Sequence, residues 1–182
     1  MQIILLVKYT LNCESMKEFY EFGLWQSSDH IASIGCGYGW WEVGLCLHYP
    51  AQHLTLVDPL VNEDDIQDSI EYFTEKTGLT WKTAFELNPE NLQKKDQIWV
   101  FNAWHEFKDR LEMLAKIKSA LNEGGIVIIE EEISKVERLQ HEGCGKNLFF
   151  EQEIIEEFEQ MGLQYVATQV KDDVAIYLKF RK

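Results

Sequence analysis

A glycine-rich turn and a later acidic residue are the two features of this chain whose types and spacing could do chemistry together. The segment 35–39 reads Gly-Cys-Gly-Tyr-Gly and follows the apolar run 31–34, while Asp58 ends a second apolar run, 54–57. Glycine permits sharp turns and leaves no side chain between the backbone and a ligand. A carboxylate can accept hydrogen bonds from both hydroxyl groups of a ribose. The order strand, turn, helix, strand, acid therefore predicts a site for an adenosine-containing cofactor.

The residue that follows Gly39 limits which cofactor fits. Dinucleotide-binding turns read G-x-G-x-x-G and need a small residue at position 40, where this chain has Trp40. A phosphate-binding P-loop is excluded too, because no Lys-Ser or Lys-Thr pair follows the glycines. The remaining G-x-G-x-G pattern resembles the first motif of the class I S-adenosylmethionine-dependent methyltransferases, whose second strand also ends in an acid.

Two further segments carry the same resemblance. Residues 95–107 resemble the family's fourth strand and the loop after it, and residues 121–130 resemble its helix end, Gly-Gly turn and fifth strand. The order and spacing of these three segments match the family over roughly residues 29–180. The resemblance implies S-adenosylmethionine as the cofactor and S-adenosylhomocysteine as its product. It also implies a set of cofactor-binding residues: Ser33, Gly35, Cys36, Gly37, Tyr38, Gly39, Asp58, Pro59, Glu86, Asn102 and Ala103.

Ser33 is a departure from the family's pattern. It stands two residues before the first glycine, where the family has an acid that helps to hold the methionine ammonium group of the cofactor. Serine accepts a hydrogen bond but brings no charge, which would weaken this contact by about 1–2 kcal/mol. The substitution leaves two readings open, an active enzyme with weaker cofactor binding and a catalytically silent relative.

The resemblance places His105 and Glu106 in the loop that faces the substrate. The sulfonium group already activates the methyl, so the protein mainly has to align the acceptor and exclude water. A general base is needed only for an acceptor that is protonated at working pH, and histidine titrates near neutrality. His105 and Glu106 are therefore the catalytic candidates, with a loop-structuring histidine as the alternative. Asn102 is expected at the methionine end of the cofactor, and Glu86 is expected either to meet the adenine amino group or to be solvated.

The segment 134–150 is the most distinctive part of the chain. It contains His141 and Cys144 and follows the expected fifth strand, where this family varies its substrate loops. Its glycines permit movement, so we predict a loop on the substrate side, with a plain surface connection as the alternative. A metal site built from His141, Cys144 and either His105 or Glu130 is a further alternative, but the H-x-x-C spacing lacks the paired ligands of zinc motifs, so the sequence predicts no metal.

Composition limits the partners. The chain has 182 residues and a net charge of −14, and its longest basic cluster is the pair Lys94-Lys95. Such acidity repels phosphate backbones, which argues against a nucleic-acid substrate. The four cysteines form no C-x-x-C pair, which favours a reducing cytoplasm over a disulfide framework. The apolar start 3–7 is too short for a membrane span or a signal peptide and is expected to be a buried strand or helix face.

The rest of the chain alternates strand-like and helix-like segments, which predicts an α/β protein with helices on both faces of the sheet. We expect one domain over 1–182 with an N-terminal cap, 1–29, whose helix 15–23 offers Phe19 and other aromatic side chains near the cofactor. Further helices are expected at 40–48, 63–76, 107–121 and 151–161, and the third strand at 80–85. The runs 163–169 and 174–180 are too closely linked for a crossover helix, so they form an antiparallel hairpin. The resemblance implies a Rossmann-like, seven-stranded, mostly parallel sheet that ends in this hairpin.

Together these features predict an S-adenosylmethionine-dependent methyltransferase that acts on a small molecule. The lack of a large insertion favours a small acceptor over a protein side chain. A non-catalytic module that binds a cofactor or a partner is the alternative from another class. The acceptor atom and the oligomeric state are left open.

Overall fold

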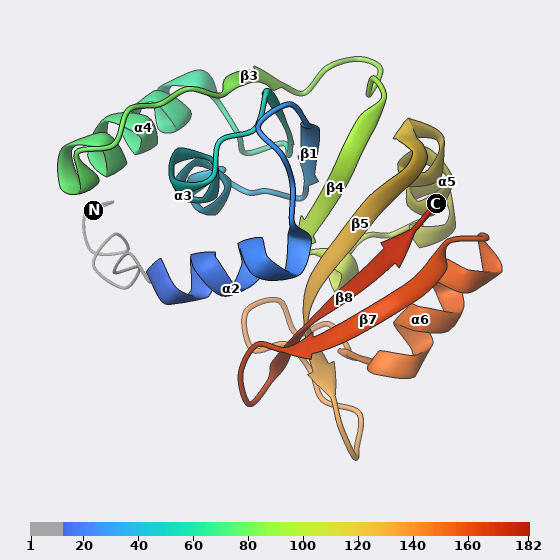
Figure 1. Ribbon diagram of the computed structural model, residues 1–182. Helices are drawn as coiled ribbons and strands as arrows, with labels where there is room; N and C mark the ends of the chain where they lie inside the picture. The colour runs from blue at the N-terminus through green and yellow to red at the C-terminus, as the bar shows by residue number, and fades with distance from the viewer. Residues whose placement is uncertain (1–12) are drawn as a thin grey trace.

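A mixed sheet forms the centre of the protein, for which a computed structural model describes residues 13–182 (Figure 1). The strand order is β3-β2-β1-β4-β5-β8-β7, with a short strand β6 paired to β5 outside this order. The strands are β1 (His30–Ile34), β2 (His53–Val57), β3 (Ala84–Leu87), β4 (Lys95–Phe101), β5 (Leu121–Ser134), β6 (Phe149–Phe150), β7 (Gln164–Val170) and β8 (Ala175–Arg181). Strands β1 to β5 pair in parallel, and β8 runs antiparallel between β5 and β7. The predicted Rossmann-like sheet is confirmed, and the pairing of β6 with β5 is an addition that the sequence did not indicate.

Helices cover both faces of this sheet (Figure 1). They are α2 (Cys13–Gly23), α3 (Trp40–His48), α4 (Glu63–Thr77), the short 3-10 helix η1 (Trp104–Glu106), α5 (Arg110–Ala120) and α6 (Glu151–Gln160). Apolar side chains of α2, α3 and α4 share one buried cluster, and those of α5 and α6 share the other. Each helix therefore buries its apolar stripe against one side of the sheet.

The strand order reverses direction beside β1. The chain runs outward from β1 through β2 to β3 and then returns to β4 on the other side of β1. In open α/β sheets, ligands bind at the carboxyl ends of the strands at such a switch point. The register aligns Ser33 of β1 with Leu56 of β2 and Trp99 of β4, so the loops after these three strands meet at one edge.

Helix boundaries follow local capping. The Asn62 side chain accepts a hydrogen bond from Asp65 N at 3.0 Å, and Gly78 ends α4 in a left-handed conformation, as predicted. The helix expected over 107–121 begins instead at Arg110, because Asp109 caps it and accepts from Glu112 N at 2.9 Å. The third strand lies at Ala84–Leu87 rather than 80–85, so its expected position was wrong by several residues.

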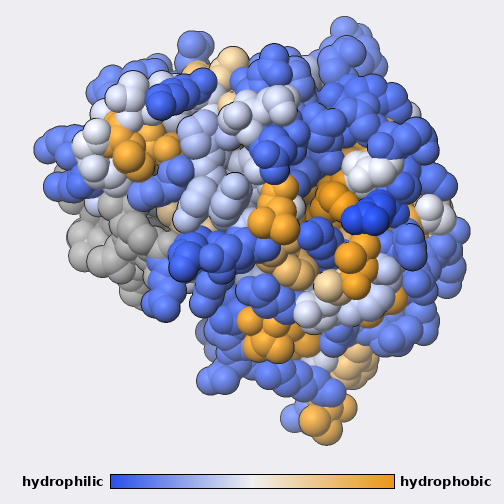
Figure 2. All heavy atoms as spheres, viewed as in Figure 1, coloured by the Kyte–Doolittle hydropathy of each residue, from blue (hydrophilic) through white to orange (hydrophobic). Residues whose placement is uncertain are grey.

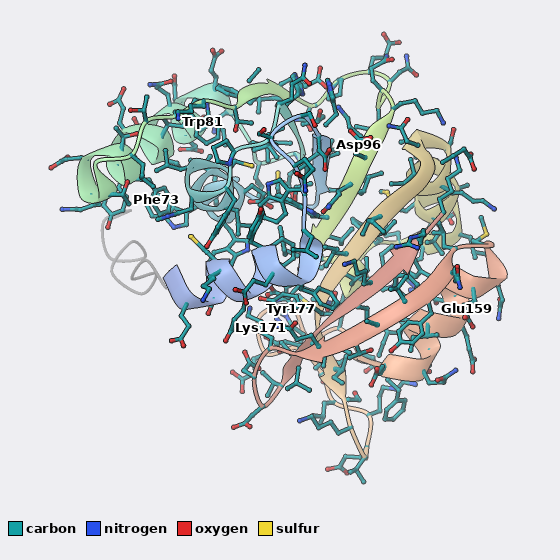
Figure 3. The ribbon with its side chains drawn as sticks, viewed as in Figure 1. Phe73, Trp81, Asp96, Glu159, Lys171 and Tyr177 are labelled. Carbon is teal, nitrogen blue, oxygen red and sulfur yellow. The ribbon has the colours of Figure 1, made fainter. Side chains whose placement is uncertain are left out.

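The C-terminal hairpin is confirmed. Asp172 in its turn accepts hydrogen bonds from Val174 N and Ala175 N at 2.9 and 2.8 Å, which fixes the reversal. Lys171 lies in this turn and Tyr177 follows it in β8 (Figure 3). Tyr177 is fully buried, and its ring centroid lies 5.4 Å from that of Phe19.

Phe19 is a core residue. Its side chain is fully buried and also contacts Trp99 edge to face, with ring centroids 5.4 Å apart. The expectation that it offers surface near the cofactor was wrong, because β4 and β8 present large aromatic side chains that cover it. The expected apolar element at 3–7 lies outside the described residues.

The surface reflects the composition. The face seen in Figure 2 is mostly hydrophilic, with apolar side chains in small separate patches. Among residues 13–182, no helix combines the length and apolar character that crossing a membrane requires.

Candidate cofactor and acceptor site

The glycine turn joins β1 to α3 with all three glycines in left-handed conformations, at φ 76° for Gly35, 56° for Gly37 and 73° for Gly39. A Cβ atom at Gly35 would lie 2.6 Å from the Ala103 side chain, and one at Gly39 would lie 2.5 Å from Ile66. A Cβ atom at Gly37 would meet nothing within 4 Å. The outer glycines thus permit close packing beneath the turn, whereas the central one leaves backbone open to a ligand.

Asp58 is fixed against this turn. Its Oδ2 accepts a hydrogen bond from Gly37 N at 3.0 Å, and its Oδ1 accepts from Leu60 N at 2.8 Å. Each carboxylate oxygen has a second lone pair, so the group can still accept from a ribose diol. Asp58 and the turn, which are far apart in the sequence, therefore form one unit as predicted.

Asn88 fixes the backbone of Asp58, a role that the sequence analysis did not predict. Its side chain accepts from Asp58 N and donates to Asp58 O, both at 2.9 Å. The residue has φ 43°, a conformation that asparagine tolerates better than most residues. An asparagine directly after a strand was the only signal for this role.

Glu42 is a second residue that the sequence reading missed. It lies in the first turn of α3, is 2% exposed, and accepts a hydrogen bond at 2.6 Å from the Ser33 hydroxyl. Burial raises the pKa of Glu42 to about 7, with the Ser33 hydrogen bond opposing this rise and the charges of Glu130 and Asp58 adding to it. A carboxyl group thus stands beside Ser33 after all, supplied by the helix instead of the strand. Its signal was a glutamate among apolar residues in a helix that begins at a glycine turn.

Asn102 lies at the carboxyl end of β4 as predicted, with an unusual φ of 46°. Its N–H donates to Glu130 O at 2.7 Å, which ties the loop to β5. Its side-chain Oδ1 is buried and has no hydrogen-bond partner within the described chain. An unpaired buried acceptor is costly unless something binds it, so this amide is a credible contact for a cofactor.

The other predicted cofactor residues differ in exposure. Ala103 is buried beside Gly35, and Cys36 is half-buried. Burial, with the charges of Glu42 and Asp58, raises the pKa of the Cys36 thiol, which keeps it neutral. Tyr38 and Pro59 are exposed at the rim of the turn.

Glu86 has partners of its own. Its Oε1 accepts from the Thr55 hydroxyl at 2.7 Å and from Lys95 Nζ at 3.4 Å. The two contacts hold the Glu86 carboxylate against its neighbours in the sheet, and the Lys95 ammonium group neutralises part of its charge. They do not support the expected adenine contact, which stays a prediction.

His105 is buried in η1 and is 5% exposed, with its Nδ1 hydrogen-bonded to Glu131. Burial by itself would lower the pKa of His105, but the hydrogen bond and charge of Glu131, with a contribution from the Cys144 thiol, raise it. Burial raises the pKa of Glu131, and His105 opposes that rise. Since a carboxylate orients the ring through Nδ1, the Nε2 atom is the one presented to the site. The predicted Glu106 side chain is half exposed, 3.9 Å from that Nε2.

Glu131 was not singled out in the sequence, although it belongs to a run of three glutamates near the end of β5. Side chains on a strand alternate between faces. Glu130 forms an ion pair with Lys171 at 2.5 Å, Glu131 bonds His105, and Glu132 lies 3.8 Å from His141. The run therefore serves three different partners rather than one.

The segment 134–150 folds back over the end of β4. Asn102 Nδ2 lies 3.5 Å from His141 Nε2, and the His105 and His141 ring centroids are 4.6 Å apart. Lys146 Nζ donates to Glu106 O at 2.8 Å, which fastens the segment to η1. The structure thus brings the predicted loop residues next to the predicted catalytic ones.

A hollow of about 350 Å³ lies at the opposite edge of the sheet. It is lined by the starts of β4 and the parallel part of β5, including Asp96 and Gly125, and by Arg181 near the end of β8. The glycine turn, Asp58 and Asn102 do not border it. We place the functional site at the carboxyl edge, because the unpaired and strained groups gather there.

Comparison with known proteins supports the assignment of the fold. No family model matches the sequence, and no curated protein sequence matches it. Solved structures do match. A 1,6-didemethyltoxoflavin-N1-methyltransferase from Burkholderia thailandensis, with bound 1,6-didemethyltoxoflavin and S-adenosylhomocysteine, is 16% identical with a TM-score of 0.69, over 98% of this chain and 80% of the other.

Two further structures extend this likeness. A SAM-dependent methyltransferase from Aquifex aeolicus is 16% identical with a TM-score of 0.67, over 92% of this chain and 88% of the other. The [4+2]-cyclase SpnF is 13% identical with a TM-score of 0.69, over 92% of this chain and 80% of the other. The chain has the fold of the class I S-adenosylmethionine-dependent methyltransferases, and one of these neighbours is named for a different reaction.

Proposed function

We propose that this protein is an S-adenosylmethionine-dependent methyltransferase that acts on a small-molecule acceptor. The observation that carries the proposal is a pair of carboxyl side chains placed against the glycine turn at the switch point of the sheet. Glu42 accepts a hydrogen bond from the Ser33 hydroxyl at 2.6 Å, and Asp58 accepts one from Gly37 N at 3.0 Å. Such a site is complementary to a cofactor that carries a sulfonium and an ammonium group.

The residues at this edge fit the cofactor. Asp58 suits the ribose hydroxyls, and the open backbone at Gly37 permits close approach. Glu42, beside Ser33, suits the ammonium group that the family binds with an acid at the serine position. The unpaired Asn102 Oδ1 can accept a hydrogen bond at the methionine end. When bound, the cofactor supplies an activated methyl group, and this chain would contribute alignment and the exclusion of water.

The acceptor side is formed by η1 and the segment 134–150. His105 is held through Nδ1 by Glu131, so its Nε2 could take the proton from an acceptor that must lose one. The loop is fastened to η1 by Lys146 and places His141 beside Asn102, and such a cover over the end of β4 favours a small acceptor over an extended chain. A 1,6-didemethyltoxoflavin-N1-methyltransferase shares the fold, which supports a small acceptor over a protein side chain.

A non-catalytic module that binds the cofactor or a partner is the second candidate. Ser33 favours it, because serine brings no charge to the ammonium group of the cofactor. The buried Glu42 argues against a module that binds only a partner, because an ionisable group under the glycine turn destabilises the protein unless it serves a ligand there.

Calorimetric titration of the full chain with S-adenosylmethionine and S-adenosylhomocysteine tests the proposal. We expect both to bind, and we expect Asp58→Ala to weaken binding by tenfold or more, because the variant loses two hydrogen bonds to a charged acceptor, worth about 1.5–3 kcal/mol each. The exposed Asp64→Ala is the matched control and should bind as the parent does. Absence of binding by the parent chain would overturn the proposal. Binding without transfer of a labelled methyl group to any small acceptor would instead favour the non-catalytic module.

A further inference from the structure

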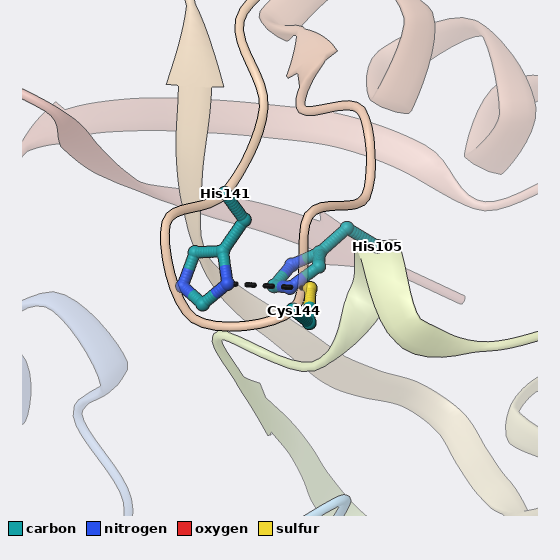
Figure 4. A group of neighbouring side chains, drawn as sticks. All are labelled: His105, His141 and Cys144. Atoms are coloured by element: carbon teal, nitrogen blue, oxygen red, sulfur yellow. Dashed lines mark hydrogen bonds between the residues drawn. The ribbon is translucent and has the colours of Figure 1, made fainter.

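His105, His141 and Cys144 converge beside the site described above (Figure 4). His105 comes from η1, and the other two come from the segment 134–150. One nitrogen of each imidazole and the Cys144 sulfur all lie within 4.8 Å of one another. His141 Nδ1 is 3.3 Å from that sulfur. Three atoms of two metal-ligating residue types thus face a common point.

The buried His105 supplies an independent sign of a ligand. Its Nε2 atom is buried and makes no hydrogen bond within residues 13–182, and the residue is 5% exposed. A buried polar atom without a partner costs about 1–3 kcal/mol. The cost is removed if a ligand binds at Nε2, which points toward the other two side chains.

Each imidazole is also oriented from behind by polar groups. His105 Nδ1 bonds Glu131, and His141 Nε2 lies 3.8 Å from a carboxylate oxygen of Glu132. Metal-bound histidines regularly donate the N–H of the nitrogen that does not bind the metal to a carboxylate or carbonyl oxygen, which fixes the ring and increases its basicity. Here that arrangement leaves His105 Nε2 and His141 Nδ1 free to face the Cys144 sulfur.

We propose that His105 Nε2, His141 Nδ1 and Cys144 Sγ bind a zinc ion. Two imidazoles and a thiolate suit Zn²⁺, whereas Mg²⁺ and Ca²⁺ prefer oxygen ligands. Glu131 and Glu132 add negative charge that favours a cation. Three protein ligands leave a fourth position for water, which is the pattern of catalytic rather than structural zinc sites.

In the sequence this site was only a weak alternative, because the H-x-x-C spacing lacks paired ligands and both His105 and Glu130 were open as the third ligand. Folding brings His105 from the end of β4 to complete the set. Zinc at this position would take the lone pair that His105 offers as a base. The ion would then assume the task of lowering the pKa of water or of an acceptor group in its fourth position.

The test uses the full chain after removal of metal with a chelator. Calorimetric titration with zinc chloride should give one equivalent bound. Substitution with Co²⁺ should give a thiolate-to-metal charge-transfer band together with the visible bands of a tetrahedral site. Neither readout needs cofactor or acceptor, so failure here is distinguishable from failure of the methyltransferase proposal.

Variants assign the ligands. Cys144→Ser should remove the charge-transfer band and lower zinc affinity at least tenfold, and His141→Ala should lower it similarly. Both residues lie in a surface segment, so the fold should persist and is checked by circular dichroism. Cys36→Ser is the matched cysteine control and should keep the band. Glu131→Gln should lower affinity about 10–100-fold by releasing His105.

Two results would overturn the site. One is zinc binding by the parent chain that is no tighter than by the Cys144→Ser, His141→Ala double variant. The other is a Co²⁺ spectrum that keeps the thiolate band in Cys144→Ser and loses it in Cys36→Ser.

Discussion

Glu42 is a single residue whose burial lowers the stability of the protein near neutral pH. Its carboxyl group lies in the first turn of α3 and is 2% exposed. It accepts a hydrogen bond from the Ser33 hydroxyl. Burial raises its pKa from the ordinary 4.5 to about 7. An apolar or amide side chain of the same size would be easier to bury. We interpret this acid as the replacement for the one missing at position 33.

The effect of pH on stability follows from this shift. Between pH 4.5 and about 7 the folded protein retains a proton on Glu42 that the unfolded chain has released, so stability falls as pH rises through this window and then levels off. We expect Glu42→Gln to raise the free energy of unfolding at pH 8 by up to about 3 kcal/mol, and to change it little at pH 4. Urea unfolding of both proteins at the two pH values measures this.

The same variant should weaken S-adenosylmethionine binding, since the amide carries no charge for the ammonium group. The exposed Glu63→Gln, in the first turn of α4, is the matched control and should change neither property by much. If Glu42→Gln left affinity unchanged while stabilising the protein, the acid would be no part of the cofactor site.

Among the elements, the turn 35–39 holds glycines in two different surroundings, packed and open. Gly35 and Gly39 have side chains of other elements where a Cβ would stand, whereas Gly37 faces open space. All three have positive φ, which costs an L-residue about 1–2 kcal/mol. Substitutions along one short turn should therefore have different consequences.

We expect Gly37→Ala to lose about 1–2 kcal/mol of stability from backbone strain alone, yet to lose cofactor affinity strongly because the methyl group fills the approach to the backbone. Gly35→Ala should lose more stability, since its Cβ would lie 2.6 Å from that of Ala103. Thermal unfolding and calorimetry measure the two effects. Equal affinity in Gly37→Ala and the parent would show that the open backbone is not the cofactor's path.

At the scale of the whole molecule, the net charge of −14 creates a field that attracts cations. S-adenosylmethionine carries one positive charge more than S-adenosylhomocysteine, in its sulfonium group. Salt screens such long-range attraction, with a Debye length of about 10 Å at 0.1 M and about 3 Å at 1 M.

The affinity ratio of S-adenosylmethionine to S-adenosylhomocysteine should therefore fall as sodium chloride is raised. Titration of both ligands at low and high salt measures this ratio, and the contribution of the extra methyl group that does not depend on salt cancels when the two ratios are compared. A ratio that stays constant would mean that local contacts alone, and not the field of the protein, distinguish the sulfonium.

The sequence by itself determined the parts of the protein that depend on neighbours along the chain. The glycine turn, the acid at the end of β2, the capping of α4 by Asn62 and the C-terminal hairpin are all local patterns, and each was predicted. Alternation of strands and helices then restricted the sheet to a parallel one with an antiparallel end. The boundaries of β3 and α5 were less accurate, because the pairing of β2 and the cap at Asp109 decided them.

Only the tertiary structure decided which side chains share a site. Glu42 reaches Ser33 because a helix folds over a strand end, and Glu131 reaches His105 across 26 residues of chain. Likewise, the segment 134–150 returns to place His141 and Cys144 beside His105. The physical reason is that burial and charge are properties of packed surroundings. A carboxylate or an imidazole has the same letter in the sequence whether it is solvated or buried with a single partner.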